Sequence, residues 1–259
     1  MSADTLGTSS AARPGRRWSR GQLARHLVTP AALAVVLLAL YLWVSGQELD
    51  SIEARVLDAG AIGDATLRHL KLTAIASLLI VAIAMPLGIL LTRPRARWIT
   101  PVALAAANMG QAAPALGVLV IMAMLFSIGQ TVAIAALVVT AILPVLRNTI
   151  IGIQQVDRSL VEAAFGMGLT PGQVLRKIEL PLAVPVMLAG LRTTIVLSVG
   201  VATVATFVNA GGLGDIIVAG IKTTRTPILL TGAVLTTVVA FALDWLAGVL
   251  EHSVRPRGL

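Results

Sequence analysis

Long, uninterrupted apolar runs separate short polar segments along most of this 259-residue chain. Runs of about 20 apolar residues are long enough to cross the roughly 30 Å hydrocarbon core of a bilayer as α-helices. Hydrophobic residues make up 57% of the chain and charged residues only 12%, which leaves too little polar surface for a soluble domain of this length. The sequence therefore predicts one all-α, integral membrane domain. An outer-membrane barrel is excluded, because its strands would alternate between apolar and polar residues.

Six membrane-spanning helices are expected, at about 29–46, 70–92, 99–126, 130–150, 182–208 and 228–250. The third run is long for one crossing and is interrupted by Asn108, Gly110, Gln111 and Pro114, so we expect a broken or steeply tilted helix there. The polar segments between and around the spans are expected to be a disordered basic tail at 1–28, loops at 47–69, 157–181 and 209–227, and a second tail at 251–259.

Arginine and lysine are unequally shared between alternate polar segments. Fourteen lie in the segments 1–28, 93–98, 147–181 and 251–259, against four in 47–69, 127–129 and 209–227. Cytoplasmic segments carry the excess of basic residues in membrane proteins. We therefore expect both termini and the 157–181 loop to be cytoplasmic, and the 47–69 and 209–227 loops to be external. Because this distribution accounts for the net charge of +8, no nucleic-acid partner is expected.

The loop at 157–181 carries signals for two short helices. Ser159-Leu160-Val161-Glu162 fits a capping box with Ser159 as the N-cap residue, and Gly168 fits the left-handed residue that ends a helix. Thr170-Pro171-Gly172-Gln173 fits a second capping box, and Pro181 is expected to break the chain before the fifth span. The pattern predicts a helix–glycine–helix unit that lies along the membrane surface and can be bound by another protein.

The same loop reads Glu162-Ala163-Ala164, then Gly168, then nine residues, then Ile178-Glu179-Leu180-Pro181. This spacing resembles the cytoplasmic EAA loop of binding-protein-dependent ABC import permeases. The resemblance implies an all-α fold of about six helices of the methionine-importer (MetI-like) type in a bacterial inner or plasma membrane, with a core permease domain at 70–250. It also implies which residues couple the chain to an ATP-binding subunit: Glu162, Ala163, Ala164, Gly168, Leu180 and Pro181. The alternative is that Glu162 is only a helix cap and Gly168 only a turn; both readings are compatible, because a coupling helix still needs caps.

Further strings resemble permeases that import osmoprotectants such as glycine betaine, choline or carnitine. These strings are His69 to Thr73, Pro86-Leu87-Gly88, Leu143 to Thr149, Gly190 to Thr193 and Asn209 to Asp215. The resemblance covers about 66–250, and it departs from the family at Asn209-Ala210, where Gly-Ala is common. Importers of the methionine type share the glycine string, so a permease for a methionine-like amino acid is the alternative.

No nucleotide-binding motif is expected to function in this chain. The closest string, Gly220-Ile221-Lys222-Thr223, lacks the Walker spacing and lies on the predicted external side. We therefore expect a transport subunit that is not an enzyme and holds no cofactor, with ATP and Mg²⁺ in a partner subunit. The resemblance further implies an extracytoplasmic binding protein and a second permease, either another copy or a related chain, in contact with membrane lipid.

Polar residues in the spans and glycines at the external edge are the candidates to line or gate the pathway: Asn108, Gln111, Asn148, Arg192, Gly211, Gly212, Gly214 and Asp244. Charged residues inside spans usually face the bundle interior and find partners. Arg192 and Asp244 lie at depths that differ by about 6 Å at the helical rise, so we hypothesise that they pair. The alternative is that each snorkels separately to the inner surface. The glycine string suits an external gate or, alternatively, a flexible loop.

Two other kinds of site have little support. An ion-coupled secondary transporter needs membrane-embedded carboxylates, and Asp244 alone is thin support for one. His26, His69 and His252 lie far apart along the chain, so no metal site is expected. Only nine aromatic residues are present, without a cluster that could cage a quaternary ammonium. We therefore expect selectivity to reside mainly in the binding protein, and this chain to provide a low-affinity passage.

Overall fold

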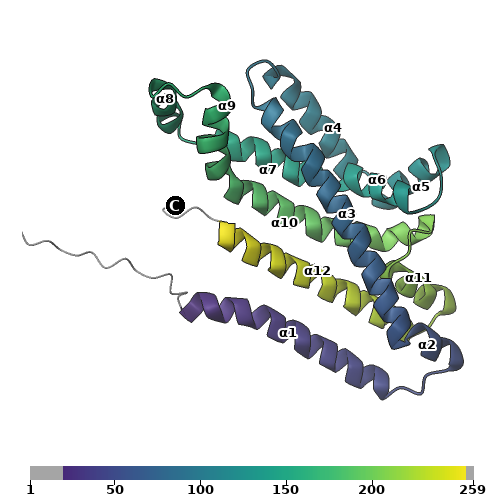
Figure 1. The fold of residues 1–259 in the computed structure, drawn as a ribbon. Coiled ribbons are helices and arrows are strands. Elements are labelled where there is room, and N and C mark those ends of the chain that lie inside the picture. Colours follow the sequence, from purple (N-terminus) through teal and green to yellow (C-terminus); the bar gives the residue numbers. More distant parts are fainter. Residues whose placement is uncertain (1–19, 255–259) are drawn as a thin grey trace, which may run out of the picture.

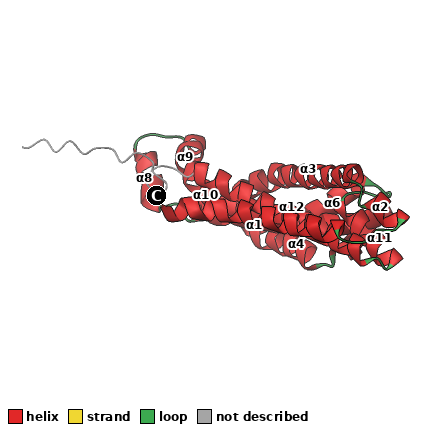
Figure 2. Ribbon diagram, turned by 90° about the horizontal axis from the view of Figure 1, so that it is seen from below, coloured by secondary structure: helices red, strands yellow, loops and turns green. Residues whose placement is uncertain are grey.

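The computed structural model describes residues 20–254, with side chains described for 27–251. Every regular element in that range is a helix, and the helices form one elongated bundle (Figures 1 and 2). The expected all-α fold is therefore confirmed. The tail expected at 1–28 lies outside the described residues up to residue 19, and so does the last part of the tail expected at 251–259.

The helices follow one another along the chain in this order: α1 (Arg20–Ser45), α2 (Ser51–Val56), α3 (Ala59–Leu91), η1 (Arg97–Ile99), α4 (Thr100–Ala112), α5 (Ala115–Leu125), α6 (Gln130–Ala141), α7 (Leu143–Gln154), α8 (Arg158–Gly166), α9 (Pro171–Val174), the π-helical η2 (Leu175–Glu179), α10 (Leu180–Val204), η3 (Ala205–Val208), α11 (Leu213–Thr223) and α12 (Thr226–Val254). Within the described residues, four helices are long and apolar enough to cross a membrane, or up to six if each of two bent pairs is one span.

Both bent pairs turn at a proline. The segments before and after Pro114 meet at 99°, and α6 meets α7 at 42° just before Pro144. Proline lacks the amide hydrogen that a helix needs, and its ring clashes with the carbonyl four residues earlier. The broken third helix expected from the polar interruptions is therefore confirmed, with the break at the proline.

Helix α7 packs closely against α3 and α10 at glycines. A Cβ on Gly88 would lie 2.7 Å from Thr149 Cβ, and a Cβ on Gly190 would lie 2.6 Å from the Pro144 carbonyl oxygen. Small residues matter at such contacts because helices in lipid associate largely through van der Waals packing. Close packing of α10 against α7 therefore explains why the Gly190 to Thr193 string begins with glycine.

Helix α1 is set apart from this core. None of the span Leu27–Ser45 is buried, and the helix runs alongside α12 (Figure 1). Its apolar side chains, such as Leu38 and Tyr41, are exposed. Lipid tails are as apolar as leucine, so this surface suits a helix that faces lipid on most sides.

Different helices lie at the two ends of the bundle. Helices α8 and α9 lie at one end, together with the start of α1 and the end of α12, whereas α2 and α11 lie at the other (Figures 1 and 2). The loop expected to couple to an ATPase therefore shares an end of the bundle with both ends of the described chain.

Candidate functional site: coupling loop and transmembrane polar groups

Helix α8 begins directly after Asp157. The Asp157 carboxylate accepts a hydrogen bond from the Ser159 backbone N–H at 2.9 Å, which makes Asp157 the N-cap residue. The expected N-cap residue, Ser159, was therefore wrong by two positions. Asp157 is the more favourable cap, because its carboxylate also interacts favourably with the helix dipole. The Ser159 backbone amide stabilises the ionised carboxyl and lowers the pKa of Asp157.

The Glu-Ala-Ala residues lie in the middle of α8. Glu162 and Ala163 are exposed, and Ala164 is fully buried. Because the helix starts earlier than expected, Glu162 is not the third residue of α8 and is not needed as a cap. The Glu162 side chain is exposed, and so are the apolar side chains of Phe165 and Met167 further along the loop.

Gly168 ends α8 in the left-handed conformation, with φ +81°. Its N–H donates to the Phe165 carbonyl at 2.9 Å, and the Leu169 N–H donates to the Ala164 carbonyl at 3.1 Å. These are the two paired bonds of a Schellman motif. The expected left-handed glycine is confirmed, and a side chain at this position would be strained.

The second helix of the loop begins as expected but does not stop. The Thr170 N–H donates to Gln173 Oε1 at 2.8 Å, with Pro171 in the first turn, so the second capping box is confirmed. The break expected at Pro181 is wrong, because residues 171–208 form one continuous helical segment. The π-helical turn η2 widens the helix just before Pro181, and such single turns inserted into α-helices frequently mark functional sites.

The last two expected coupling residues lie where this segment enters the bundle. Leu180 is half-buried against the cluster of Ile153, Ala183 and Met187, and Pro181 is exposed. Leu180 therefore anchors the loop to α7 and α10, whereas Pro181 leaves its ring on the surface.

An ion pair ties this loop to the end of α3. Arg93 Nη2 donates to Glu179 Oε2 at 2.7 Å, and the Glu179 side chain is only 13% exposed. Glu179 is the residue between Ile178 and Leu180, which the motif leaves unspecified. Sequence reasoning missed this pair, since 86 positions separate its members and the only signal was opposite charge on segments predicted to share a membrane face.

A second ion pair lies between the long helices α10 and α12. Arg192 Nη2 donates to Asp244 Oδ2 at 2.5 Å, and Arg192 Nε donates to Asp244 Oδ1. The geometry is the bidentate one in which a planar guanidinium matches a carboxylate. The two side chains are thus in contact, as hypothesised, instead of snorkelling apart. Their part in a pathway stays a prediction.

The glycine string forms a tight turn into α11. Gly211 and Gly212 have φ of +80° and +109°, and a Cβ on Gly214 would lie 2.0 Å from the Thr203 carbonyl oxygen. Asn209 is also left-handed, with φ 58°. Asparagine enters that region more readily than other residues with a Cβ, which explains why it is tolerated where the resembling family has glycine. The geometry describes a fixed turn; gating by it stays a prediction.

His69 joins this turn to the helix core. The imidazole is fully buried on α3, and its Nε2 lies 3.2 Å from the Val199 carbonyl oxygen of α10. A Cβ on Gly212 would lie 3.1 Å from His69 Nδ1. Sequence reasoning had placed His69 in a string shared with the osmoprotectant permeases and had set it aside as a metal ligand, and it missed the packing against the glycine turn.

The remaining pathway candidates are separate from these contacts. Asn108 is exposed and Gln111 half-buried on α4, and Asn148 lies on α7 against Gly190. Within the described part of the chain, no side-chain hydrogen bond connects these three to the Arg192–Asp244 pair. Among the predicted pathway residues, the structure therefore joins Arg192 to Asp244 and places Gly211, Gly212 and Gly214 at one turn.

The sequence was compared with known proteins. Residues 84–256 match the family described as "Binding-protein-dependent transport system inner membrane component". The chain is 41% identical over 192 residues to the carnitine transport permease protein OpuCD of Listeria monocytogenes, covering 73% of this chain and 84% of that one. It is 38% identical over 194 residues to the choline transport system permease protein OpuBB of Bacillus subtilis, covering 75% and 88%. It is 39% identical over 222 residues to the osmoprotectant import permease protein OsmY of Salmonella typhimurium, covering 86% and 92%.

Solved structures resemble the fold. An inward-facing MetNI methionine ABC transporter has a TM-score of 0.66 and 25% identity, over 75% of this chain and 96% of that chain. An amino acid ABC transporter crystallised with histidines has a TM-score of 0.66 at 20% identity, over 80% of this chain and all of that one, which bears on the fold alone.

Fold, polar groups and comparisons together define a multi-pass permease subunit of a bacterial inner membrane. The chain belongs to the family of binding-protein-dependent ABC transport permeases. It is a transport subunit and not an enzyme, and a system of this class includes an ATPase and a binding protein.

Proposed function

We propose that this chain is the permease of an importer for small osmoprotectants such as glycine betaine, choline or carnitine. The observation that carries the proposal is the 38–41% identity to three relatives whose names concern carnitine, choline and osmoprotectants. A methionine-like amino acid is the alternative substrate, favoured by the 25% identity to the MetNI structure. The higher identity and coverage of the osmoprotectant relatives support the first.

In this proposal, α8 and α9 are cytoplasmic and dock with the ATP-binding subunit. The charge distribution supports the orientation. Support for docking comes from the exposed side chains of α8 and its C-cap: Glu162 is exposed, Phe165 is 46% exposed and Met167 is 72% exposed. An apolar surface with an adjacent charge is a suitable contact for a protein groove. ATP and Mg²⁺ would be held by the partner.

Two permeases, either two copies or this chain with a related one, would enclose the pathway, with two ATPase subunits beneath them. Movement of the docked α8–α9 unit would then alternate access between the two membrane faces. The proposed pathway groups are Asn108, Gln111, Asn148, the Arg192–Asp244 pair, and the turn at Gly211, Gly212 and Gly214. Their polarity in otherwise apolar helices supports this assignment.

Reconstitution in liposomes with the ATPase and the binding protein tests the substrate. Uptake of labelled glycine betaine, choline, carnitine and methionine is measured with and without ATP. We expect ATP-dependent uptake of at least one quaternary ammonium compound. Uptake of methionine alone would overturn the osmoprotectant assignment. Transport by this chain without partners, driven by an ion gradient, would overturn the ABC mechanism.

Co-purification tests the docking surface. Gly168→Leu and Glu162→Lys are each expected to abolish capture of the ATPase subunit from membranes. Gly166→Ala is the matched control, because nothing lies within 4 Å of a Cβ there and the residue is on the same helix. Retention of the ATPase by both altered chains would contradict the proposed docking.

A further inference from the structure

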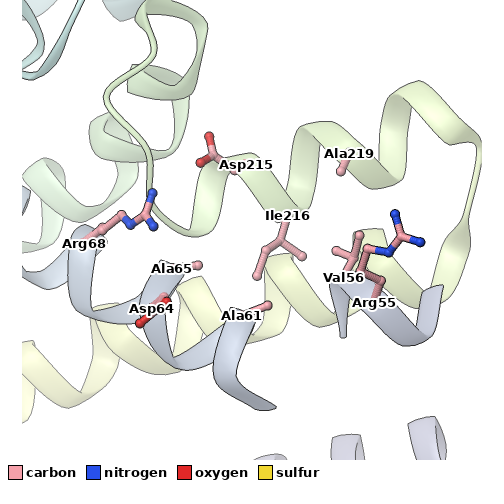
Figure 3. A pocket seen from close by; sticks show the side chains of 9 residues that line it. All are labelled: Arg55, Val56, Ala61, Asp64, Ala65, Arg68, Asp215, Ile216 and Ala219. Carbon is pink, nitrogen blue, oxygen red and sulfur yellow. The ribbon is translucent and has the colours of Figure 1, made fainter. Parts of the chain in front are cut away.

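A pocket of about 430 Å³ lies at the α2–α11 end of the bundle (Figure 3). It is lined by α2, the first turns of α3 and the first turns of α11. Helix α3 has 33 residues and is therefore about 50 Å long, whereas the hydrocarbon core is roughly 30 Å thick. The first turns of α3, and the pocket with them, can therefore extend beyond the lipid into water.

The pocket carries two charges of each sign. Arg55 and Arg68 supply the positive charges, and Asp64 and Asp215 supply the negative ones. Figure 3 shows Arg68, Asp64 and Asp215 around one end of the pocket and Arg55 at the other, with Ile216 between them. The mixture distinguishes this pocket from one that would select a simple anion or a simple cation.

The two carboxylates at the start of α2 share one cationic partner, whereas the charges that line the pocket have no ion-pair partner in the described part of the chain. Asp50 and Glu53 both form ion pairs with Arg225. Within the described residues, by contrast, Arg68 and Asp64 form no ion pair, and Asp215 accepts a hydrogen bond only from Thr206 Oγ1. Charged groups without protein partners in one pocket are available to a ligand.

Arg68 and Asp215 also flank the glycine turn. A Cβ on Gly211 would lie 3.4 Å from Arg68 Cδ and 3.7 Å from Asp215 Oδ2. The absence of a side chain at Gly211 therefore leaves room between a guanidinium and a carboxylate. A ligand held by both groups would contact the turn that leads into α11.

We propose that this pocket binds a small zwitterion, with its carboxylate on Arg68 and its quaternary ammonium near Asp64 and Asp215. A guanidinium matches a carboxylate with two parallel hydrogen bonds. A quaternary ammonium offers no N–H donor, so charge and apolar contact, here from Ile216, are what can hold it. The inference rests on the proposed function, and it names an external site where the permease receives the solute.

The pocket residues include no aromatic side chain, so the site lacks the cage that gives tight binding of quaternary ammonium groups. Weak binding suits a site that must release the solute into the pathway. Specific capture would remain the task of the binding protein, and the pocket would orient the zwitterion after delivery.

A comparison of glycine betaine with choline tests the role of Arg68 separately from that of the two aspartates. Both solutes have a quaternary ammonium, and only glycine betaine has a carboxylate. In the reconstituted importer, Arg68→Gln is expected to lower glycine betaine uptake at low concentration by about tenfold, the usual loss for a charge-assisted hydrogen bond, and to change choline uptake less than about twofold. Asp215→Asn is expected to lower uptake of both. Lys222→Gln, the same charge change on an exposed residue of α11 outside the pocket, is the control.

Direct binding gives a second measurement that does not depend on which solutes are imported, and it is made on equal amounts of folded, purified complex. Saturation-transfer NMR of the glycine betaine methyl protons is recorded on the complex with its ATPase in nanodiscs, without binding protein. We expect a saturable signal that Arg68→Gln removes and Lys222→Gln retains. No saturable signal from the unaltered complex, or one unchanged by Arg68→Gln, would overturn the site.

Two transport outcomes also decide against it. Equal loss of glycine betaine and choline uptake in Arg68→Gln would show that the residue acts in docking of the binding protein or in structure. Unchanged uptake of both would show that it does not act at all. If the unaltered importer carries no quaternary ammonium compound, the proposed function fails; NMR then still reports separately whether the pocket binds a zwitterion.

Discussion

Arg93 Nη2 lies 2.7 Å from Glu179 Oε2, and this contact connects the end of α3 with the π-helical turn η2. The partly buried pair holds the α8–α9 unit against the segment that leads into α4. Loss of either charge leaves the other poorly compensated and loosens this connection by about 1 kcal/mol.

We therefore expect Arg93→Gln and Glu179→Gln to lower solute import several-fold while ATP hydrolysis falls much less. The measurement is the ratio of solute imported to ATP hydrolysed in liposomes. The exchange Arg93→Glu with Glu179→Arg should recover much of that ratio. If both single variants keep the normal ratio, the pair has no part in coupling.

The Arg192–Asp244 pair gives a second prediction. Asp244→Asn leaves the partly exposed guanidinium of Arg192 without its carboxylate partner, so we expect strongly reduced transport at normal expression. Arg192→Lys should also be impaired, because an ammonium cannot form the bidentate contact. Exchange of the two charges is the decisive variant, and uptake is measured alongside the amount of chain in the membrane. Failure of the exchanged chain to transport, with normal expression, would count against a role for the pair itself.

The close contact of α7 with α10 predicts that Gly190 cannot be enlarged. A methyl group at Gly190 would lie 2.6 Å from the Pro144 carbonyl oxygen and 2.7 Å from Asn148 Cβ. We expect Gly190→Ala to lower stability by about 1–3 kcal/mol, as overpacking typically does. Thermal unfolding of the purified complex measures this. Gly200→Ala on the same helix is the control, since nothing lies within 4 Å of its Cβ, and equal unfolding temperatures for both variants would contradict the prediction.

Capping of α8 should depend on pH in one direction. The folded-state pKa of Asp157 is lowered from 3.8, chiefly by the Ser159 backbone N–H. A carboxyl with a lowered folded pKa stabilises the folded state above its unfolded pKa, and this contribution is lost as pH falls through the folded value. Amide exchange across α8, taken relative to the intrinsic exchange rate at each pH, should therefore be insensitive to Asp157 ionisation from pH 7 to about 5, and rise only below the ordinary pKa.

Asp157→Asn tests the origin of that effect. Asparagine still caps a helix but does not titrate in this range, so exchange in α8 should lose the component assigned to Asp157. Exchange–mass spectrometry of peptides covering α8 measures the difference against the unaltered chain. An identical low-pH increase in both chains would assign it to another group.

Much of the fold could be predicted because its causes are local. Apolar run length predicted where the long helices lie, Pro114 and its polar neighbours predicted the broken third helix, and Gly168 predicted the end of α8. Each depends on residues within a few positions of one another, whose backbone requirements do not change with context. The local competition between Asp157 and Ser159 for the cap was the exception, because both residues are good caps and only the folded loop decides between them.

What could not be predicted depends on contacts between distant segments. Glu179 reads locally as a charge in a surface helix, and only the arrival of α3 gives it a partner. Pro181 is a different case: it reads as a helix breaker, but it lies in the first turn of α10, where its missing N–H is tolerated. The Arg192–Asp244 contact could be predicted, because helical rise alone placed both residues at similar depths. The proposed zwitterion pocket could not, because only the folded Gly211 turn brings Arg68 and Asp215 near each other.

The uninterrupted helix from Pro171 to Val208 has a mechanical consequence. Its 38 residues lead from the loop proposed to hold the ATPase to the far end of the bundle, and α9 is turned away from the direction of α10 (Figure 1). A broken chain at Pro181 would have absorbed a push as local bending. We expect the continuous helical turns from α9 into α10 to pass a tilt at α9 on to the opposite end of α10, beside the Gly211–Gly212 turn.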